Sequence, residues 1–198
     1  MRLTPCLAAL AALAASPALA APVTYNLVKD HVDVSFGIDH LGFSTTHGWF
    51  RHPDATLVLD ADHPEDAKLR VTVDAASIDT NQTERDKDLR GAMWLDTAKY
   101  PTMTFVSTRI VRTSDDTADV VGDLTLHGVT KPLTLKTRMN KMGPSPFGGT
   151  PTVGFTAVGI LKRSDYGIAT YLPAIGDEVK LLIDAEFNVP GPPPAAKK

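Results

Sequence analysis

The sequence predicts an all-β protein in which about eight antiparallel strands surround one core. Apolar side chains recur at every second position in segment after segment, which is the period of a strand with one buried face. Polar residues occupy the positions between them, as in an antiparallel sheet with one face exposed to water. So many strands with so few helices must hide their edges, by closing into a barrel or stacking into a sandwich. No linker interrupts residues 21–189, which we therefore expect to form one domain.

The first predicted strand illustrates the pattern. It places Val34, Phe36 and Ile38 on one face, and acidic or small residues on the other. Comparable segments follow along the chain, most of them connected as sequential neighbours. The predicted strands cover residues 32–39, 55–60, 69–75, 102–113, 117–126, 132–138, 152–163 and 177–189.

One pair of neighbouring segments predicts a hairpin. Leu124 and Leu126 are expected opposite Leu133 and Leu135, across a turn at 127–131. These four leucines would then share one face of the sheet.

The predicted inward face is apolar throughout. Gly154 and Gly159 interrupt an otherwise good strand and indicate bulges or sharp coiling, which barrels need. From the pattern alone, a filled core is the favoured interpretation, because small barrels are usually packed solid. The residues predicted to face the interior are Val34, Phe36, Ile38, Val71, Val73, Phe105, Leu124, Leu126, Leu133, Leu135, Phe155 and Leu182.

A short helical insertion, near 83–99, breaks the run of strands. Residues 84–90 favour helix, and Thr83 and Asp86 have the spacing of a capping box. Gly91 is a good helix stop, and a second short turn follows before the next proline. An insertion of this length between two strands should lie at the end or on the flank of a barrel.

Six charged residues crowd into this helix, and they have two possible roles. Paired carboxylates can act as acid and base. However, Glu84 with Lys87 and Asp86 with Arg90 have the spacing of ion pairs on an exposed helix, and neighbouring cations keep carboxylates ionised. We therefore favour a solvated helix, with an anion-binding role for Arg85 or Arg90 as the alternative.

An apolar cluster at 93–95 follows the helix and should be buried, and the mouth of a barrel is a natural place for it.

The N-terminus predicts export. Arg2 precedes an apolar run, and the run ends in a small-residue cleavage motif, so residues 1–20 are expected to be a signal peptide cleaved after Ala20. Cys6 is the only cysteine, so the mature chain would hold no disulfide, thiolate metal site or cysteine nucleophile. An exported protein without disulfides suits a bacterial periplasm. No transmembrane segment is expected in the mature chain, and the proline-rich residues 190–198 are expected to be a disordered tail.

Composition and motifs exclude several functions. The formal net charge of −3 argues against a nucleic-acid partner. His40, His47 and His52 do not have the spacing of a helical zinc site, so no metal and no cofactor is predicted. Neither a nucleophile elbow nor a phosphate-binding loop is present. A metal-assisted hydrolase that uses His40 and His47 remains one alternative, and an interaction module with a solid barrel remains another.

Four motifs resemble the YceI-like family of periplasmic proteins, described as polyisoprenoid-binding. They are "FGIDHLGFSTTHGWF", "DTNQTERDKDLRGAMWLDTAKYPTMTFVST", "GDLTLHGVTKPLTLK" and "KRSDYGI…GDEVKLLIDAEF", in family order and across nearly the whole mature chain. The resemblance implies a lipocalin-like, extended eight-stranded antiparallel barrel that is often a homodimer. No catalytic activity is established for the family as a whole, so we expect this protein not to be an enzyme. Its long apolar pore would hold an isoprenoid lipid, such as a polyprenyl phosphate or a quinone.

The resemblance turns the inward residues into a predicted lining for this lipid. The chain departs from the family in Gly91, in Asp88, where many relatives carry His, and in Met93 and Trp94, which add apolar bulk. The predicted ligand-binding residues at the mouth are Leu89, Met93, Trp94, Tyr100 and Tyr166, with His40, Arg85 or Arg90 at a polar headgroup.

Overall fold

The computed structural model describes residues 21–191. The predicted signal peptide, 1–20, and most of the predicted tail lie outside the described residues. Within the described range, no helix combines the length and apolar character needed to cross a bilayer.

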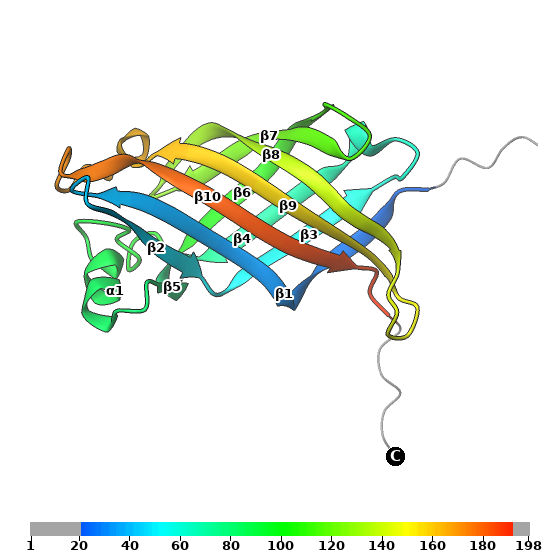
Figure 1. Cartoon of the computed structure of the whole chain (residues 1–198), viewed down its shortest axis with the longest axis horizontal. Helices are drawn as coiled ribbons and strands as arrows, with labels where there is room; N and C mark the ends of the chain where they lie inside the picture. Colours follow the sequence, from blue (N-terminus) through cyan, green and yellow to red (C-terminus); the bar gives the residue numbers. More distant parts are fainter. Residues whose placement is uncertain (1–20, 192–198) are drawn as a thin grey trace, which may run out of the picture.

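Eight strands form the barrel, and Figure 1 shows them running obliquely along one long body. They pair as neighbours in the order β10-β9-β8-β7-β6-β4-β3-β1, and a further pairing of β10 with β1 closes the ring. Every pairing is antiparallel. The barrel strands are β1 (Val23–His40), β3 (Pro53–Leu59), β4 (Lys68–Asp74), β6 (Thr102–Arg112), β7 (Thr117–Leu126), β8 (Val129–Pro144), β9 (Pro151–Lys162) and β10 (Ile175–Asn188).

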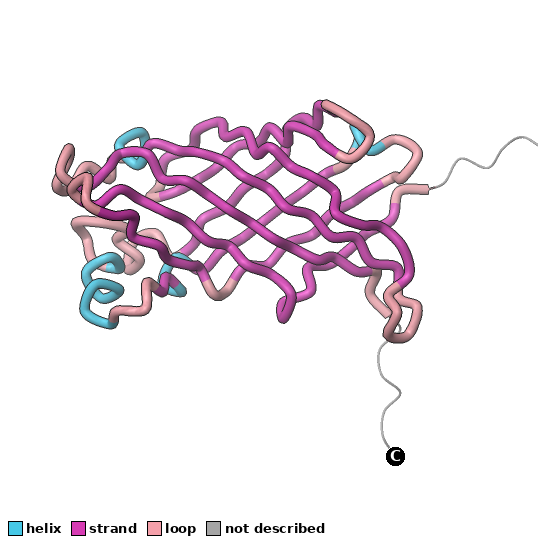
Figure 2. The backbone as a smooth tube through the Cα atoms, viewed as in Figure 1, coloured by secondary structure: helices cyan, strands magenta, loops and turns pink. Residues whose placement is uncertain are grey.

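Smaller elements gather at the ends of this barrel, as Figure 2 shows. Strand β2 pairs with the C-terminal part of β1, and β5 pairs with β2. We call the end that carries α1 the α1 end, and the opposite end, with the loops 60–67, 113–116 and 145–150, the far end. The remaining elements are β2 (Ser44–Phe50), β5 (Ile78–Asp79), α1 (Thr83–Arg90) and three 3-10 turns, η1 (Pro64–Asp66), η2 (Ala75–Ser77) and η3 (Arg163–Tyr166).

The predicted all-β class, the closed eight-stranded barrel and the single helical insertion are confirmed. Strand β1 is much longer than predicted, because its first half pairs with β3 and its second half with β2. Strand β2 was not predicted at all. Its sequence, STTHGWF, lacks the alternation of apolar residues by which the other strands were found.

The hairpin between β7 and β8 is present, but its turn is shorter than predicted. Only His127 and Gly128 form it, both with positive φ, as a two-residue hairpin turn requires. Leu126 therefore pairs with Val129, and Leu133 with Gly122. The predicted turn at 127–131 is wrong because a pattern of leucines does not show where pairing begins.

The N-terminus of α1 also differs from the prediction. Gln82, not Thr83, caps the helix, and its side chain accepts a hydrogen bond of 2.6 Å from the Arg85 backbone N–H. The predicted capping box is wrong because the Asp86 carboxylate accepts hydrogen bonds from Thr80 instead.

Close contacts between strands depend on one glycine in particular. Strand β7 passes Gly122 under the ring of Phe105, and a Cβ at Gly122 would lie 2.4 Å from that ring and 2.6 Å from the Val106 carbonyl oxygen. At Gly154, opposite an irregularity in β8, a Cβ would meet only the Glu186 side chain, at 4.0 Å.

We expect Gly122→Ala to lower the free energy of unfolding by about 1–3 kcal/mol, because a methyl group there must displace both a ring and a backbone oxygen. The matched control is Gly154→Ala, where the methyl group has room. Urea denaturation followed by circular dichroism measures both variants. Equal midpoints for the two would show that Gly122 is not required for packing.

Candidate functional site

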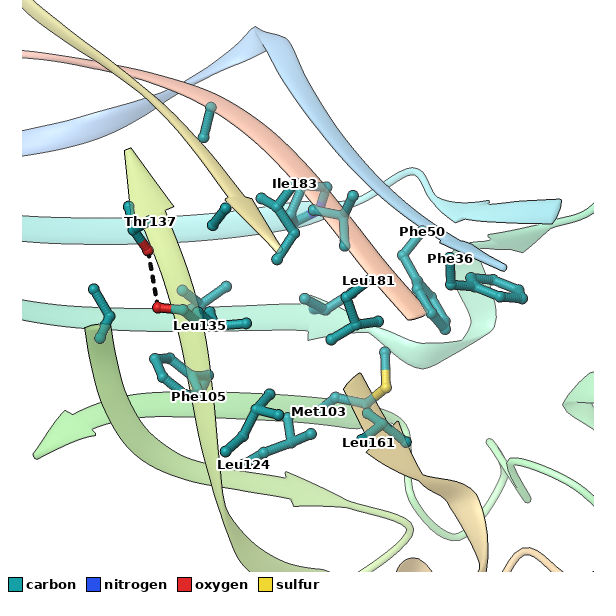
Figure 3. Close-up of a pocket in the computed structure, with 18 of the residues that line it drawn as sticks. Phe36, Phe50, Met103, Phe105, Leu124, Leu135, Thr137, Leu161, Leu181 and Ile183 are labelled. Carbon is teal, nitrogen blue, oxygen red and sulfur yellow. Dashed lines mark hydrogen bonds between the residues drawn. The ribbon is translucent and has the colours of Figure 1, made fainter. Parts of the chain in front are cut away.

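A cavity of about 710 Å³ occupies the interior of the barrel. This volume lies within the range of about 300–1,000 Å³ that is usual for small-molecule sites. Every barrel strand contributes to its wall, and Figure 3 shows side chains from several strands converging on the space. Each of the eight barrel strands contributes at least one apolar side chain. Examples, from β1 to β10 in chain order, are Val34, Leu57, Val71, Phe105, Leu124, Leu135, Leu161 and Leu181.

The middle of the cavity is almost entirely apolar. Phe105, Leu133 and Leu135 are buried around it. Thr137, which also lines it, donates its hydroxyl hydrogen to the Leu135 carbonyl oxygen at 3.2 Å, so this polar group is satisfied within the wall (Figure 3). The wall therefore suits hydrocarbon and offers few groups to a polar ligand.

The two ends of the cavity differ. At the far end, Tyr25 of β1, Val153 of β9 and Phe187 of β10 pack into a buried cluster. Beside this cluster the lining continues to η1 and to the β6–β7 turn, where the exposed residues Asp115 and Asp116 line it. The α1 end is built instead from loops that polar side chains hold in place.

A buried carboxylate fixes α1 to the barrel. Asp86 is 7 % exposed, and its carboxylate accepts hydrogen bonds from the Thr80 backbone N–H, at 2.8 Å, and from the Thr80 hydroxyl, at 2.5 Å. Arg85 donates to the Thr80 hydroxyl and carbonyl oxygens at 2.7 and 2.8 Å. These contacts turn one side of the helix, with Arg85, Asp88 and Leu89, toward the cavity.

A buried cation holds the loop between β9 and β10. Arg163, which is 3 % exposed, donates to the carbonyl oxygens of Ile168, Ile175 and Gly176 at 2.8–3.0 Å. Its guanidinium also lies 5.2 Å from the centre of the Trp94 ring, a cation–π contact. Burial lowers the pKa of Arg163, against the effect of the Asp177 charge, but a guanidinium stays protonated at neutral pH.

Two further titratable groups, Asp177 and Tyr166, lie in or beside this loop. Burial works to raise the pKa of Asp177, but hydrogen bonds from the Ser164 N–H and hydroxyl, at 2.9 and 2.7 Å, hold it below its ordinary value. Burial raises the pKa of the Tyr166 phenol.

The mouth combines cations and carboxylates that both line the cavity, namely Arg85, Arg163, Asp39 and Asp88. None of the ion pairs formed within residues 21–191 involves these four side chains.

Most of the predicted ligand-binding residues line this cavity, although their part in binding stays a prediction. They come from six strands and the α1 region. They are Val34, Phe36, Ile38, His40, Val71, Val73, Arg85, Leu89, Trp94, Phe105, Leu124, Leu126, Leu133, Leu135 and Phe155.

The inward orientation predicted for Leu182 is wrong. Leu182 is 46 % exposed on the outside of β10, whereas Leu181 and Ile183 on either side of it line the cavity. Because Leu181 and Leu182 are adjacent, the sequence does not show which of them faces inward. The regular spacing of Val179, Ile183 and Phe187 was the signal that could have shown it.

Four residues predicted at the mouth also lie outside the lining. Arg90 donates to the Ala76 and Ile78 carbonyl oxygens, so it anchors α1 rather than meeting a ligand. The Met93 side chain is 64 % exposed.

The two tyrosines predicted at the mouth are structural neighbours instead. The Tyr100 ring packs edge-on against His127, with 4.7 Å between ring centres. Tyr166 is 2 % exposed and belongs to a buried cluster behind the wall. Its carbonyl oxygen lies 3.0 Å from Nδ1 of the same His127. Sequence spacing alone could not show that these rings pack behind the wall.

Several lining residues were missed. Phe50 comes from the unpredicted strand β2, and its ring lies 5.7 Å from that of Phe36. Nothing in the sequence marks Arg163 as a lining residue, because an arginine is expected to be exposed unless its carbonyl partners are known. His40 lines the cavity and His47 does not. Within residues 21–191, no group of three or more His, Cys, Asp or Glu side chains has the arrangement of a metal site.

Comparison with known proteins agrees with this geometry. The model of the YceI-like domain matches residues 25–187. A YceI protein from Escherichia coli is 44 % identical over 172 residues, which cover 87 % of this chain and 89 % of that protein. The chain belongs to the YceI-like family.

Two solved structures place this YceI-like barrel among its neighbours. A YceI protein from Campylobacter jejuni has a TM-score of 0.70 at 29 % identity, over 77 % of this chain and 90 % of that one. A polyisoprenoid-binding domain from Saccharophagus degradans has a TM-score of 0.64 at 16 % identity, over 84 % of this chain and 98 % of that one. The second likeness is one of fold.

In this YceI-like chain, the three unusual residues predicted near the mouth, Asp88, Met93 and Trp94, differ in whether they line the cavity. Asp88 lines the cavity, so it places a carboxylate there. Trp94 also lines the cavity and packs between Arg163 and Tyr171, whose ring centre lies 6.1 Å away. Met93 points away from the lining, so the added apolar bulk enters the YceI-like site only through Trp94.

We expect Asp86→Ala to lower the free energy of unfolding by about 1–3 kcal/mol, because it leaves the buried Thr80 N–H without an acceptor. Asp88→Ala, on the same helix but exposed, is the control and should change stability by less than about 0.5 kcal/mol. Urea denaturation measures both. A harmless Asp86→Ala would mean that this carboxylate does not hold α1 on the YceI-like barrel.

Proposed function

We propose that this protein binds one long-chain isoprenoid lipid inside the barrel, as a carrier or store, and performs no catalysis. The observation that supports this most directly is the apolar cavity of about 710 Å³ along the barrel. A solid barrel, which the strand pattern alone favoured, has no such space. Membership of the YceI-like family and the fold shared with a polyisoprenoid-binding domain point to the same class of ligand.

The energetics of the cavity suit this ligand. Each CH₂ group removed from water contributes about 0.8 kcal/mol, so a chain of tens of carbons far exceeds the association cost of about 4–15 kcal/mol. Affinity is therefore easy to obtain from Phe105, Leu124 and Leu135 and their neighbours. Selectivity must come from the length of the cavity and from the few polar groups at its mouth.

The polar head of the lipid is proposed to lie at the α1 end. Arg85, which binds Thr80 through Nε and Nη2 and leaves Nη1 for a ligand, supplies N–H donors there, and Asp39 and Asp88 supply acceptors. Guanidinium donors suit a polyprenyl phosphate, whereas a quinone ring can accept the same hydrogen bonds and stack on Trp94. His40 lies at the same mouth and is a further candidate contact.

The place of action is proposed to be the periplasm. The prediction rests on residues 1–20, whose charged start, apolar run and cleavage motif are typical of a secretory signal. A lipid of this class needs a sleeve to cross water, and a water-filled compartment between two membranes is where such a sleeve is useful.

A homodimer is also proposed, and an exposed apolar strip supports it. Val158 and Leu182 face each other across β9 and β10 on the outside of the barrel and are 45 and 46 % exposed. Ile160, two residues along β9, is 56 % exposed. Exposed apolar strips of this kind often mark subunit contacts.

The central test is to fill the cavity. Ala157 is buried and lines it, so Ala157→Phe places a ring in the space proposed for the lipid. We expect the purified variant to retain at least about tenfold less lipid than the wild type, measured by organic extraction and mass spectrometry.

The control places a ring outside the barrel and away from the apolar strip. Val111→Phe, on the outer face of β6, should leave lipid retention unchanged. Equal retention by folded Ala157→Phe, or the absence of any extractable lipid from the wild type after growth and mild purification, would contradict the proposal.

The dimer has its own test. Leu182→Asp places a charge in the apolar strip and should weaken self-association at least about tenfold, because a buried charge there has no partner. Light scattering after size exclusion measures the molar mass. Val111→Asp, on the outside of β6, is the control. A wild type that is monomeric at all concentrations contradicts the homodimer.

A further inference from the structure

Exposed apolar side chains surround the mouth of the cavity at the α1 end. Phe43 is 90 % exposed, Leu41 50 %, Met93 64 % and Tyr171 64 %. They come from three separate segments: the β1–β2 turn, the stretch that follows α1, and the β9–β10 loop. Tyr171 also lines the cavity, so this apolar rim is continuous with the cavity wall.

Contacts between backbones and rings join these three segments into one rim. The Leu41 N–H donates to the Ala174 carbonyl oxygen at 2.9 Å. The Thr170 hydroxyl donates to the Met93 carbonyl oxygen. Figure 1 shows the β1–β2 and β9–β10 tips side by side at the α1 end. The exposed side chains therefore lie on a connected surface and do not move as unrelated loops.

The backbone of the rim is strained at two of these residues. Leu41 and Tyr171 both have a φ of 58°, in the left-handed region that bulky side chains rarely adopt. Strain of this kind persists where the surrounding structure imposes it, and it gathers at functional sites. Here it accompanies large apolar side chains that are exposed to water instead of buried.

The rim segments are uncharged, although α1 beside them carries six charged residues of mixed sign. Segments 41–43, 91–95 and 169–174 of the rim contain no charged residue. Of the far-end loops, 145–150 is uncharged and exposes Phe147, whereas 60–67 and 113–116 are acidic. Their acidic residues are Asp60, Asp62, Glu65, Asp66, Asp115 and Asp116.

We propose that this rim docks on a phospholipid bilayer, so that the mouth of the barrel opens directly onto the membrane from which the lipid is taken or to which it is delivered. The proposal rests on the proposed function, because only an insoluble ligand requires such a handover. Uncharged tips can enter the apolar edge of a bilayer, whereas the acidic loops 60–67 and 113–116 stay in water because moving their carboxylates out of water is costly. Phe43 and Tyr171 are the side chains expected to enter first.

The test is the binding of full-length mature protein to phosphatidylcholine vesicles, measured by flotation. Phe43→Ser should weaken vesicle binding by roughly tenfold or more, because a phenyl ring no longer leaves water. Phe147→Ser is the matched control, since Phe147 is 91 % exposed but lies in the far-end loop 145–150. It should bind vesicles as the wild type does.

A second measurement reports the orientation. Phe43→Trp and Phe147→Trp place a fluorophore at opposite ends, each compared with the wild type, which contains two tryptophans. With vesicles that carry brominated acyl chains, quenching should increase for Phe43→Trp alone. Equal quenching at both ends, or none at either, overturns the proposal.

The outcomes separate docking from lipid binding. Loss of vesicle binding by Phe43→Ser, with extractable lipid still in the barrel, supports docking, because Phe43 does not line the cavity. Vesicle binding that is absent in the wild type overturns docking while leaving the lipid-filled barrel intact, and a protein partner would then be the occupant of the rim. A barrel without lipid that still docks through Phe43 contradicts the proposed function only.

Discussion

The pairing of β1 with β10 is the constraint on which the rest of this structure depends. Paired from Asn26 to His40, it joins the two ends of the sheet and removes both open edges. Because a closed eight-stranded ring has a fixed circumference, its inner side chains must share a limited width. Here they line the wall without filling the centre, so closure creates the cavity as well as the fold.

Closure also leaves a difficulty at the mouth, where loops lack partners in a sheet. Their carbonyl groups must still be satisfied, and long cationic side chains supply the donors. Arg163 serves three carbonyls of the β9–β10 loop, and Arg90 serves two beside α1. Asp86 performs the reverse task for the Thr80 N–H. These buried polar contacts keep the mouth open in one shape, since an unpaired buried group would be costly.

An apolar wall that faces empty space has lost contacts that a filled core would make. A hydrocarbon chain would restore them, so the proposed lipid would stabilise the barrel. The direction proposed for that lipid rests on the difference between the ends. The far end packs Tyr25 and Phe187 closely and carries acidic loops, whereas the α1 end combines polar groups inside the mouth with an uncharged apolar rim outside it.

The sequence alone established the strand class, the helical insertion and most of the cavity wall, because period-two alternation reports which face of a strand is apolar. Phe36 and Phe105 were recognised in this way. Alternation fails where two apolar residues are adjacent, as at Leu182, and in β2, which pairs without alternating. It also cannot separate apolar residues near a helix stop, so the inward Trp94 and the outward Met93 were indistinguishable. Which loops meet at the mouth, and therefore what Arg163 binds, follows from contacts between segments distant in the chain, which are formed only when the barrel closes.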